Sequence, residues 1–112
     1  DWELAHQGPA EEDLGYLCAN VWRFGHLDRP VGGFGHYDDL IAGYASIAGW
    51  TPELRSIRYW EIFAAFSWGL VCQTMGALWH SGNGDVERAA VSRRRSEAEL
   101  DILLLIEEWD DE

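Results

Sequence analysis

The chain has 112 residues and a formal net charge of −12, and all eight of its basic residues are Arg. Hydrophobic residues make up 47% of it, which is enough to bury a core and argues against intrinsic disorder. Nucleic-acid binders normally present a basic face, because phosphate neutralisation dominates their affinity, so the acidity argues against DNA or RNA as a partner. The length predicts a single domain over residues 1–112, or one piece of a larger domain.

The first half of the chain predicts two helices separated by a glycine-rich loop. Pro9 suits a first helical turn and three acidic residues follow it, so we expect a helix over 9–20 after a strand end and loop over 1–8. Glycine and proline residues predict a loop over 22–35. The next helix is expected over 37–48, with an apolar face made of Leu40, Ile41, Tyr44 and Ile47.

The second half predicts two further helices. Thr51 can cap free amides and Pro52 fits a first helical position, which predicts a helix from there to about His80. Asp85 is a good cap for a last helix that ends near Glu108, and the apolar face of that helix is made of Ala98, Ile102, Leu105 and Trp109. The predicted fold class is therefore all-α, with about four helices.

The long helix raises the question of a membrane. Residues 62–79 carry no formal charge and could span a bilayer, and Trp60 and Trp79 flank them as interfacial anchors would. Polar residues and glycines interrupt this stretch, and no basic loop flanks it. We therefore favour a core helix of a soluble domain and expect no membrane partner.

The cysteines and histidines do not form ligand patterns. Cys18 and Cys72 match no metal or redox spacing, so we expect buried free thiols, which fit a reducing cytoplasm. The four His residues lack the spacing of zinc ligands. The run over residues 93–95 consists of three Arg, and we expect it to form surface ion pairs with Glu97 and Glu99 rather than an anion site.

The start of the chain is the most informative stretch. It reads Asp1-Trp2-Glu3-Leu4-Ala5-His6-Gln7-Gly8, and Asp13-Leu14 follows. Two carboxylates ahead of a glycine turn and an acidic helix start suit a cation. Magnesium commonly takes one or two protein carboxylates, with phosphate and water completing its shell. Carboxylates two residues apart also occur by chance, and on the residues alone that alternative stays open.

This stretch resembles the Asp-Trp-Glu-x-Ala-His-x-Gly segment of the aminoglycoside phosphotransferase and choline kinase-like family. Later blocks are similar in order and spacing: Trp22-Arg23-Phe24-Gly25, Pro30-Val31-Gly32-Gly33-Phe34-Gly35, Trp60-Glu61-Ile62-Phe63 and Trp68-Gly69. The resemblance covers nearly the whole chain up to its last helix. It implies the C-terminal helical part of a protein-kinase-like fold, in a cytoplasmic kinase that uses ATP and Mg²⁺ to phosphorylate a hydroxyl of a small molecule.

The resemblance also implies roles for three acidic residues. Asp1 would hold Mg²⁺ against the nucleotide phosphates, Glu3 is a second metal candidate, and Asp13 would brace the catalytic loop structurally. In the family the phosphate loop, the nucleotide Lys and the His-Gly-Asp catalytic loop lie upstream, so we expect no catalytic base in this chain and no activity from it alone. Pro9-Ala10 replaces the Asp-Pro that the family often has, so a carboxylate is missing there.

The candidates for contacts with the acceptor are two aromatic and two charged residues: Trp22, Arg23, Phe34 and Glu61. The alternative is that the aromatic residues pack in the core and that Arg23 pairs with Glu61 or Asp28. The expected partners are a nucleotide, a small-molecule acceptor and the missing N-terminal lobe. Self-association through the surface that the lobe would cover stays open. The alternative function is a non-catalytic helical binding module or a pseudokinase remnant.

Overall fold

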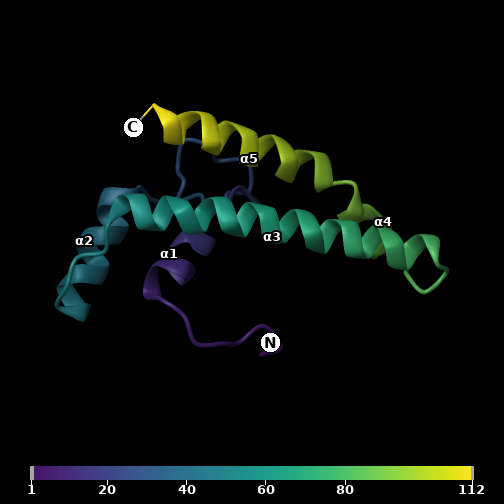
Figure 1. Cartoon of the computed structure of the whole chain (residues 1–112), viewed down its shortest axis with the longest axis horizontal. Coiled ribbons are helices and arrows are strands. Elements are labelled where there is room, and N and C mark those ends of the chain that lie inside the picture. Colours follow the sequence, from purple (N-terminus) through teal and green to yellow (C-terminus); the bar gives the residue numbers. More distant parts are fainter. Residues whose placement is uncertain (1, 112) are drawn as a thin grey trace. The chain divides into compact units, whose positions relative to one another are not determined.

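The computed structural model describes residues 2–111, and this part of the chain is helical throughout its regular structure, which confirms the predicted all-α class (Figure 1). The elements in chain order are α1 (Ala10–Cys18), the 3₁₀ turn η1 (Asn20–Trp22), α2 (Tyr37–Ala48), α3 (Leu54–His80), α4 (Val86–Ser92) and α5 (Arg95–Asp110). All four predicted helices are present, and the last is divided into α4 and α5. The chain forms two compact units, Asp1–Glu61 and Ile62–Glu112.

The first unit is built around a small core. Four buried side chains from α1, the following loop and α3 form it: Leu14, Cys18, Val31 and Ile57. Partly buried residues of α1 and α2 pack against them: Leu17, Tyr37, Leu40, Ile41 and Tyr44. The apolar face predicted for α2 is wrong at Ile47, which is 90% exposed. Ile47 lies two turns beyond Leu40, about 10 Å along the helix, so this small core ends before reaching it.

A glycine sets how closely α1 approaches α3. A Cβ atom at Gly15 would lie 2.6 Å from the carbonyl oxygen of Ile57 and 2.7 Å from the amide nitrogen of Glu61. No side chain fits there, because real Cβ atoms do not come so close to a neighbouring backbone. The two helices therefore meet backbone to backbone, and this contact brings the end of α1 next to Glu61.

Two element boundaries differ from the predictions. Residues 2–9, expected to include a strand end, form turns and coil, and within residues 2–111 strand-type pairing is confined to the bridge between Val31 and Gly35. A strand needs a hydrogen-bonded neighbour, which these residues lack here. The long helix begins at Leu54, because Pro52 is buried outside it and the Ile57 amide donates to the Glu53 carbonyl.

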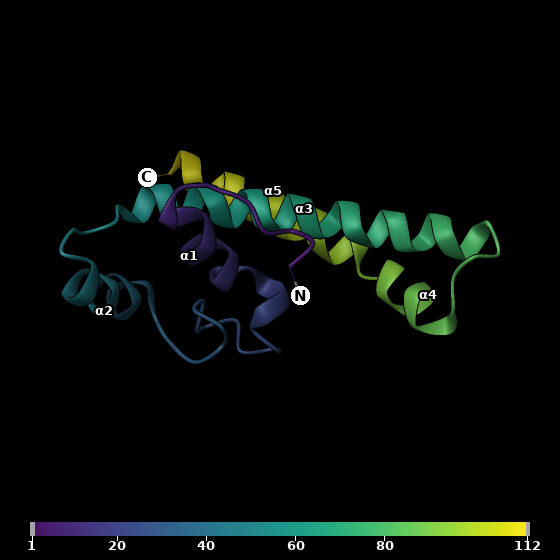
Figure 2. The same cartoon turned by 90° about the horizontal axis from the view of Figure 1, so that it is seen from below.

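In the second unit, α4 and α5 run back along α3 in the opposite direction. Gly76 of α3 lies against Ser92, and Gly69 lies against Ala98. Figures 1 and 2 show α4 and α5 as separate coils joined by a short turn. At this turn the amides of Arg93 and Arg94 donate to carbonyls three residues back, and the Arg94 guanidinium lies over the Trp68 ring at 5.8 Å.

The length and composition of α3 would allow it to cross a membrane. Its most apolar stretch has a mean hydropathy of 1.3, and 17% of that stretch is buried. The helix is thus covered along part of its surface rather than all round, which differs from the central core helix that the sequence suggested.

Candidate functional site

Glu61 is the centre of the polar structure in the first unit. It is fully buried, and its Oε1 accepts a hydrogen bond of 2.6 Å from Arg23 Nη2. The Tyr37 hydroxyl donates to Oε2 of the same carboxylate at 2.7 Å. Both carboxylate oxygens therefore have protein donors, as a buried charge requires.

Arg23 connects this carboxylate to the loop that follows α1. Its Nε and Nη2 both donate to the Cys18 carbonyl, at 3.1 and 3.0 Å, and its Nη1 donates to the Leu27 carbonyl at 3.3 Å. The planar guanidinium has several donors in a fixed geometry, so one side chain can satisfy α1, the loop and α3 together. We call Arg23, Glu61 and Tyr37 the loop clamp. We call residues 19–36, which join α1 to α2, the clamped loop.

The charges of the clamp follow from burial and hydrogen bonding. Burial raises the pKa of Glu61, and the Tyr37 hydrogen bond and the Arg23 charge oppose that rise. Burial, followed by the Glu61 charge, raises the pKa of Tyr37 and raises the pKa of the Cys18 thiol to about 12. Cys18 is thus a neutral thiol without access to solvent at physiological pH, and it is no candidate for a nucleophile.

The clamped loop has a backbone that only particular residues can adopt. Gly33 has φ +79°, and a Cβ atom there would collide with the Arg23 carbonyl oxygen. Phe24 has φ +50°, which is unusual for a residue with a side chain. Its ring is 77% exposed, so burial of the ring does not account for this conformation. Strained residues of this kind persist where the surrounding structure holds them, and they are common in binding loops.

The structure separates the four acceptor candidates into two kinds. Arg23 and Glu61 form the buried ion pair that the sequence left open as an alternative, so neither carboxylate oxygen of Glu61 faces solvent. Phe34 is 70% exposed and therefore does not pack in the core. Trp22 is partly exposed and meets the Tyr16 ring edge-on, with the ring centroids 5.6 Å apart. Trp22 and Phe34 are thus accessible from solvent, whereas Arg23 and Glu61 are used to hold the loop.

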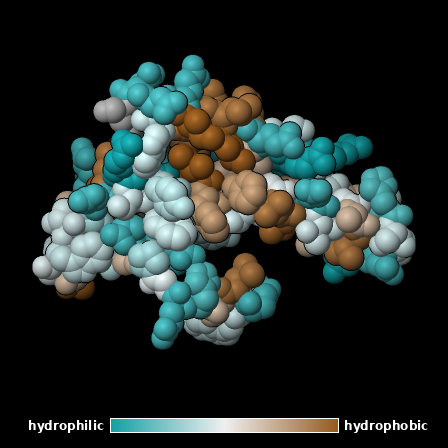
Figure 3. All heavy atoms as spheres, viewed as in Figure 1, coloured by the Kyte–Doolittle hydropathy of each residue, from teal (hydrophilic) through white to brown (hydrophobic). Residues whose placement is uncertain are grey.

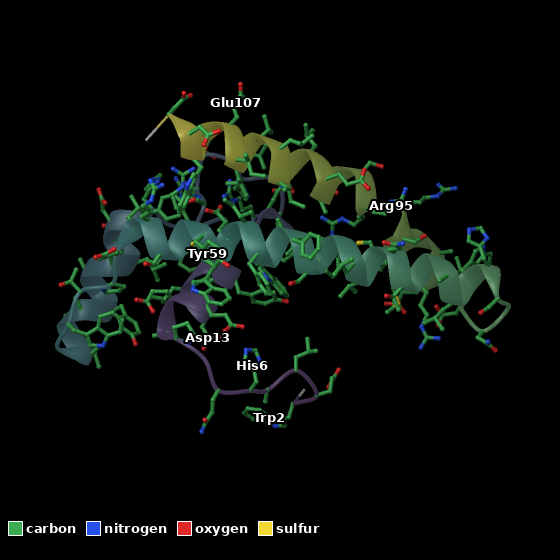
Figure 4. The ribbon with its side chains drawn as sticks, in the orientation of Figure 1. Trp2, His6, Asp13, Tyr59, Arg95 and Glu107 are labelled. Carbon is green, nitrogen blue, oxygen red and sulfur yellow. The ribbon has the colours of Figure 1, made fainter. Side chains whose placement is uncertain are left out.

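The predicted metal ligands lie at the chain start. Asp1 is outside the described residues, and Glu3 is exposed in a turn. Asp13 is exposed in the first turn of α1 (Figure 4). Across residues 2–111, no three His, Cys, Asp or Glu side chains gather where they could hold a metal ion. Glu3 is therefore the one predicted metal ligand whose position is described. Its carboxylate is the kind of ligand that Mg²⁺ prefers.

His6 anchors the N-terminal segment to α1, which the sequence did not predict. Its Nε2 lies 2.6 Å from Glu12 Oε1, and its Nδ1 lies 2.7 Å from the Leu4 carbonyl oxygen. Both neighbours are acceptors, so only the doubly protonated ring satisfies them together. The hydrogen bond to the Leu4 carbonyl and that to Glu12 raise the pKa of His6 above its usual 6.5. No periodic pattern links positions 6 and 12, so this contact had no sequence signal.

Two other sequence expectations can be checked in the second unit. Arg94 pairs with Glu97 and Arg95 with Glu99, each at 3.2 Å, which confirms the surface ion pairs predicted for the Arg run. Cys72 is buried and free, as Cys18 is, which confirms the expected state of both thiols. Tyr37 was missed as a partner of Glu61, because nothing in the sequence indicates which of four Tyr residues reaches a buried carboxylate.

Comparison with known proteins adds no relative: no protein-family model, curated protein or solved structure matches the chain.

Proposed function

We propose that the chain is the helical, acceptor-side part of a phosphotransferase that moves the γ-phosphoryl group of ATP to a hydroxyl of a small molecule. The complete protein would supply the nucleotide lobe and the catalytic base. Mg²⁺ with ATP, when bound, supplies the phosphoryl group and neutralises its charge. The part of this chain is to position the acceptor and to offer Asp1 to the metal, with Glu3 as a second candidate.

The convergence of the sequence blocks on one buried ion pair carries this proposal. Arg23 belongs to the block 22–25 and Glu61 to the block 60–63, and their side chains meet at 2.6 Å. The block 30–35 joins them, because Gly33 lies against the Arg23 carbonyl. Three separate segments that resemble one kinase family thus form a single structural feature, the clamped loop.

The clamped loop has the properties that a wall of a small-molecule pocket needs. Ligand sites combine apolar and aromatic side chains with a scaffold that holds them rigidly. Trp22 and Phe34 provide aromatic surface open to solvent, and the loop clamp fixes the backbone that carries them. Exposed Asp13 could brace a catalytic loop from outside the chain, the structural role that the resemblance implies.

The metal role is tested in the complete protein that contains this chain. Phosphoryl transfer from ATP would be measured with a panel of small hydroxyl compounds in Mg²⁺ buffer. We expect Asp1→Asn to abolish transfer, because it removes a ligand charge, while Glu11→Gln, an equal change of charge in α1, leaves turnover intact. The proposal would be contradicted if the Asp1→Asn variant turned over at the original rate. It would also be contradicted if the unaltered protein transferred phosphate to none of the acceptors.

The acceptor wall is tested by its effect on substrate binding. We expect Phe34→Ala to raise the KM for the acceptor and to leave the KM for ATP unchanged, because only the acceptor contacts this loop. Ile47→Ala removes an apolar side chain of α2 that is even more exposed, 90% against 70% for Phe34, and serves as the control. A parallel rise in both KM values would indicate that the loop does not form the acceptor wall.

The second candidate, a non-catalytic helical binding module, is favoured by a different observation. Several large apolar side chains of α5 are exposed. A complete protein that binds its partner but transfers no phosphate, with or without Asp1→Asn, would support this alternative.

A further inference from the structure

α5 has two apolar faces on opposite sides. Residues three and four positions apart share a face of a helix. One face carries Ala98, Ile102, Leu105 and Trp109, all at least partly buried, and Ala98, which is 2% exposed, lies against Gly69 of α3. The other face, half a turn away, carries Leu100, Leu103 and Leu104, all exposed. We call these three leucines the outer stripe.

A helix on the surface of one unit normally has one apolar face and a polar remainder. The outer stripe departs from this pattern, since Leu103 is 66% exposed and lies on the side of α5 opposite to the face that packs on α3. Figure 3 shows hydrophobic side chains gathered over α5. A helix with apolar faces on both sides has the composition of one that is covered on both sides, as are the inner helices of bundles.

Carboxylates surround the outer stripe. With about 3.6 residues per turn, Glu97, Asp101 and Glu108 follow one edge of the stripe. Glu99 and Asp110 follow the other edge, and Glu107 and Asp111 lie on the line of the stripe itself and end it towards the C-terminus. Figure 4 shows Glu107 directed away from α5 on the side that does not face α3. Arg94 and Arg95 at the start of the helix pair with Glu97 and Glu99, but residues 96–111 hold seven carboxylates and no basic residue, so the surroundings of the stripe keep a net negative charge.

We propose that the outer stripe docks an amphipathic helix of a partner protein in which Lys or Arg residues flank the apolar face. Helix pairs of this kind bury apolar side chains along a central seam, and charged residues on both edges select the partner. An acidic rim selects a basic one. A second copy of the chain is a poor occupant, because it would bring a second net charge of −12 and set carboxylates against carboxylates.

The test uses the 112-residue chain and a designed peptide, so it does not depend on phosphoryl transfer. The peptide is a labelled helix with Leu at positions i, i+3, i+4 and i+7 and with Arg and Lys beside them. Its controls are the same helix with Glu in place of the basic residues, and a scrambled peptide of equal composition. We expect only the first peptide to bind in fluorescence anisotropy, with an affinity that falls as salt rises.

Variants of the chain separate the outer stripe from general charge attraction. We expect Leu103→Ser to weaken binding of the basic peptide at least about tenfold, which corresponds to the loss of one buried leucine contact. Leu27→Ser, at another exposed leucine in the first unit, should leave binding unchanged. Sedimentation equilibrium of the chain alone should give a monomer.

Four results would overturn the proposal. They are no binding of the basic peptide, equal binding of the scrambled peptide, equal binding to the Leu103→Ser variant, and a dimer of the chain that Leu103→Ser dissociates. The last result would identify a second copy of the chain as the occupant of the outer stripe.

Discussion

Glu61 accepts hydrogen bonds on both carboxylate oxygens while it is fully buried, so its removal leaves the Tyr37 hydroxyl without this acceptor and the Arg23 guanidinium without its counter-charge. Removing one partner of a buried ion pair typically costs about 3–5 kcal/mol. We expect Glu61→Ala to lower the free energy of unfolding by about this amount in urea titrations followed by circular dichroism. Glu99→Ala removes an exposed pair with Arg95 and should cost less than about 0.5 kcal/mol. Similar losses in both variants would contradict the clamp.

His6 gives the first unit a contact that depends on pH. Hydrogen bonds to the Leu4 carbonyl and to Glu12 raise the pKa of His6 in the folded state above 6.5. The contact is therefore fully present below pH 6.5, and it is lost as the pH rises through the folded-state pKa. An NMR titration of the imidazole should give a midpoint above 6.5, and Glu12→Gln should lower it. The same midpoint in both proteins would show that Glu12 does not hold the ring.

The contacts of Glu61 and His6 differ in how far the sequence could predict them. Arg23 and Glu61 stood out as two opposite charges within the resembling blocks, and their pairing was one of the two alternatives left open. His6 and Tyr37 had no such signal, because their partners are set by how loops and helices meet in space. Periodicity predicts which face of a helix is apolar, but it does not predict which polar atoms lie on the segment packed against it.

At the scale of elements, helices were predictable and their ends and interruptions were not. The α2 helix has its predicted bounds, 37–48, because Gly49 in a left-handed conformation ends it. The break between α4 and α5 falls at Arg93 and Arg94, where the sequence contains no glycine or proline. There the stacking of Arg94 on Trp68 and the bond from the Ser92 hydroxyl to the Ala89 carbonyl accompany a tightened turn. Tertiary contacts of this kind override local preference.

Two helical glycines allow a direct test of how the helices pack. A Cβ atom at Gly15 would lie 2.6 Å from the Ile57 carbonyl oxygen, whereas one at Gly69 would be in ordinary contact with the Ala98 methyl group, at 3.5 Å. We expect Gly15→Ala to destabilise the chain by about 1–3 kcal/mol through overpacking. Gly69→Ala should stabilise it by up to about 1 kcal/mol, because Ala is the better helix former. Thermal unfolding of both variants measures the difference, and a loss of stability in Gly69→Ala equal to that in Gly15→Ala would contradict these contacts.

At the scale of the whole molecule, each compact unit contains one buried thiol. Cys18 lies in the core of the first unit, and Cys72 is buried in the second, where burial also raises its pKa. The sequence predicted both thiols as buried and free, but it could not predict that they belong to different units, because α3 continues without interruption through Glu61 and Ile62. Division into units depends on which side chains pack together, and a continuous helical pattern does not record it.

The two thiols can therefore report the opening of each unit separately. Cys72→Ser leaves Cys18 as the reporter of the first unit, and Cys18→Ser leaves Cys72 as the reporter of the second. In native buffer we expect both single-thiol chains to react with an aromatic disulfide reagent far more slowly than in urea, because a thiol must become exposed and ionised before it attacks. Along a urea series, each labelling rate should rise as its own unit opens, since labelling follows the population of the open form when closing is fast. A thiol that reacts in buffer at the rate of the unfolded chain would show that its surroundings are not packed as described, and the core or helix pair around that cysteine would have to be revised.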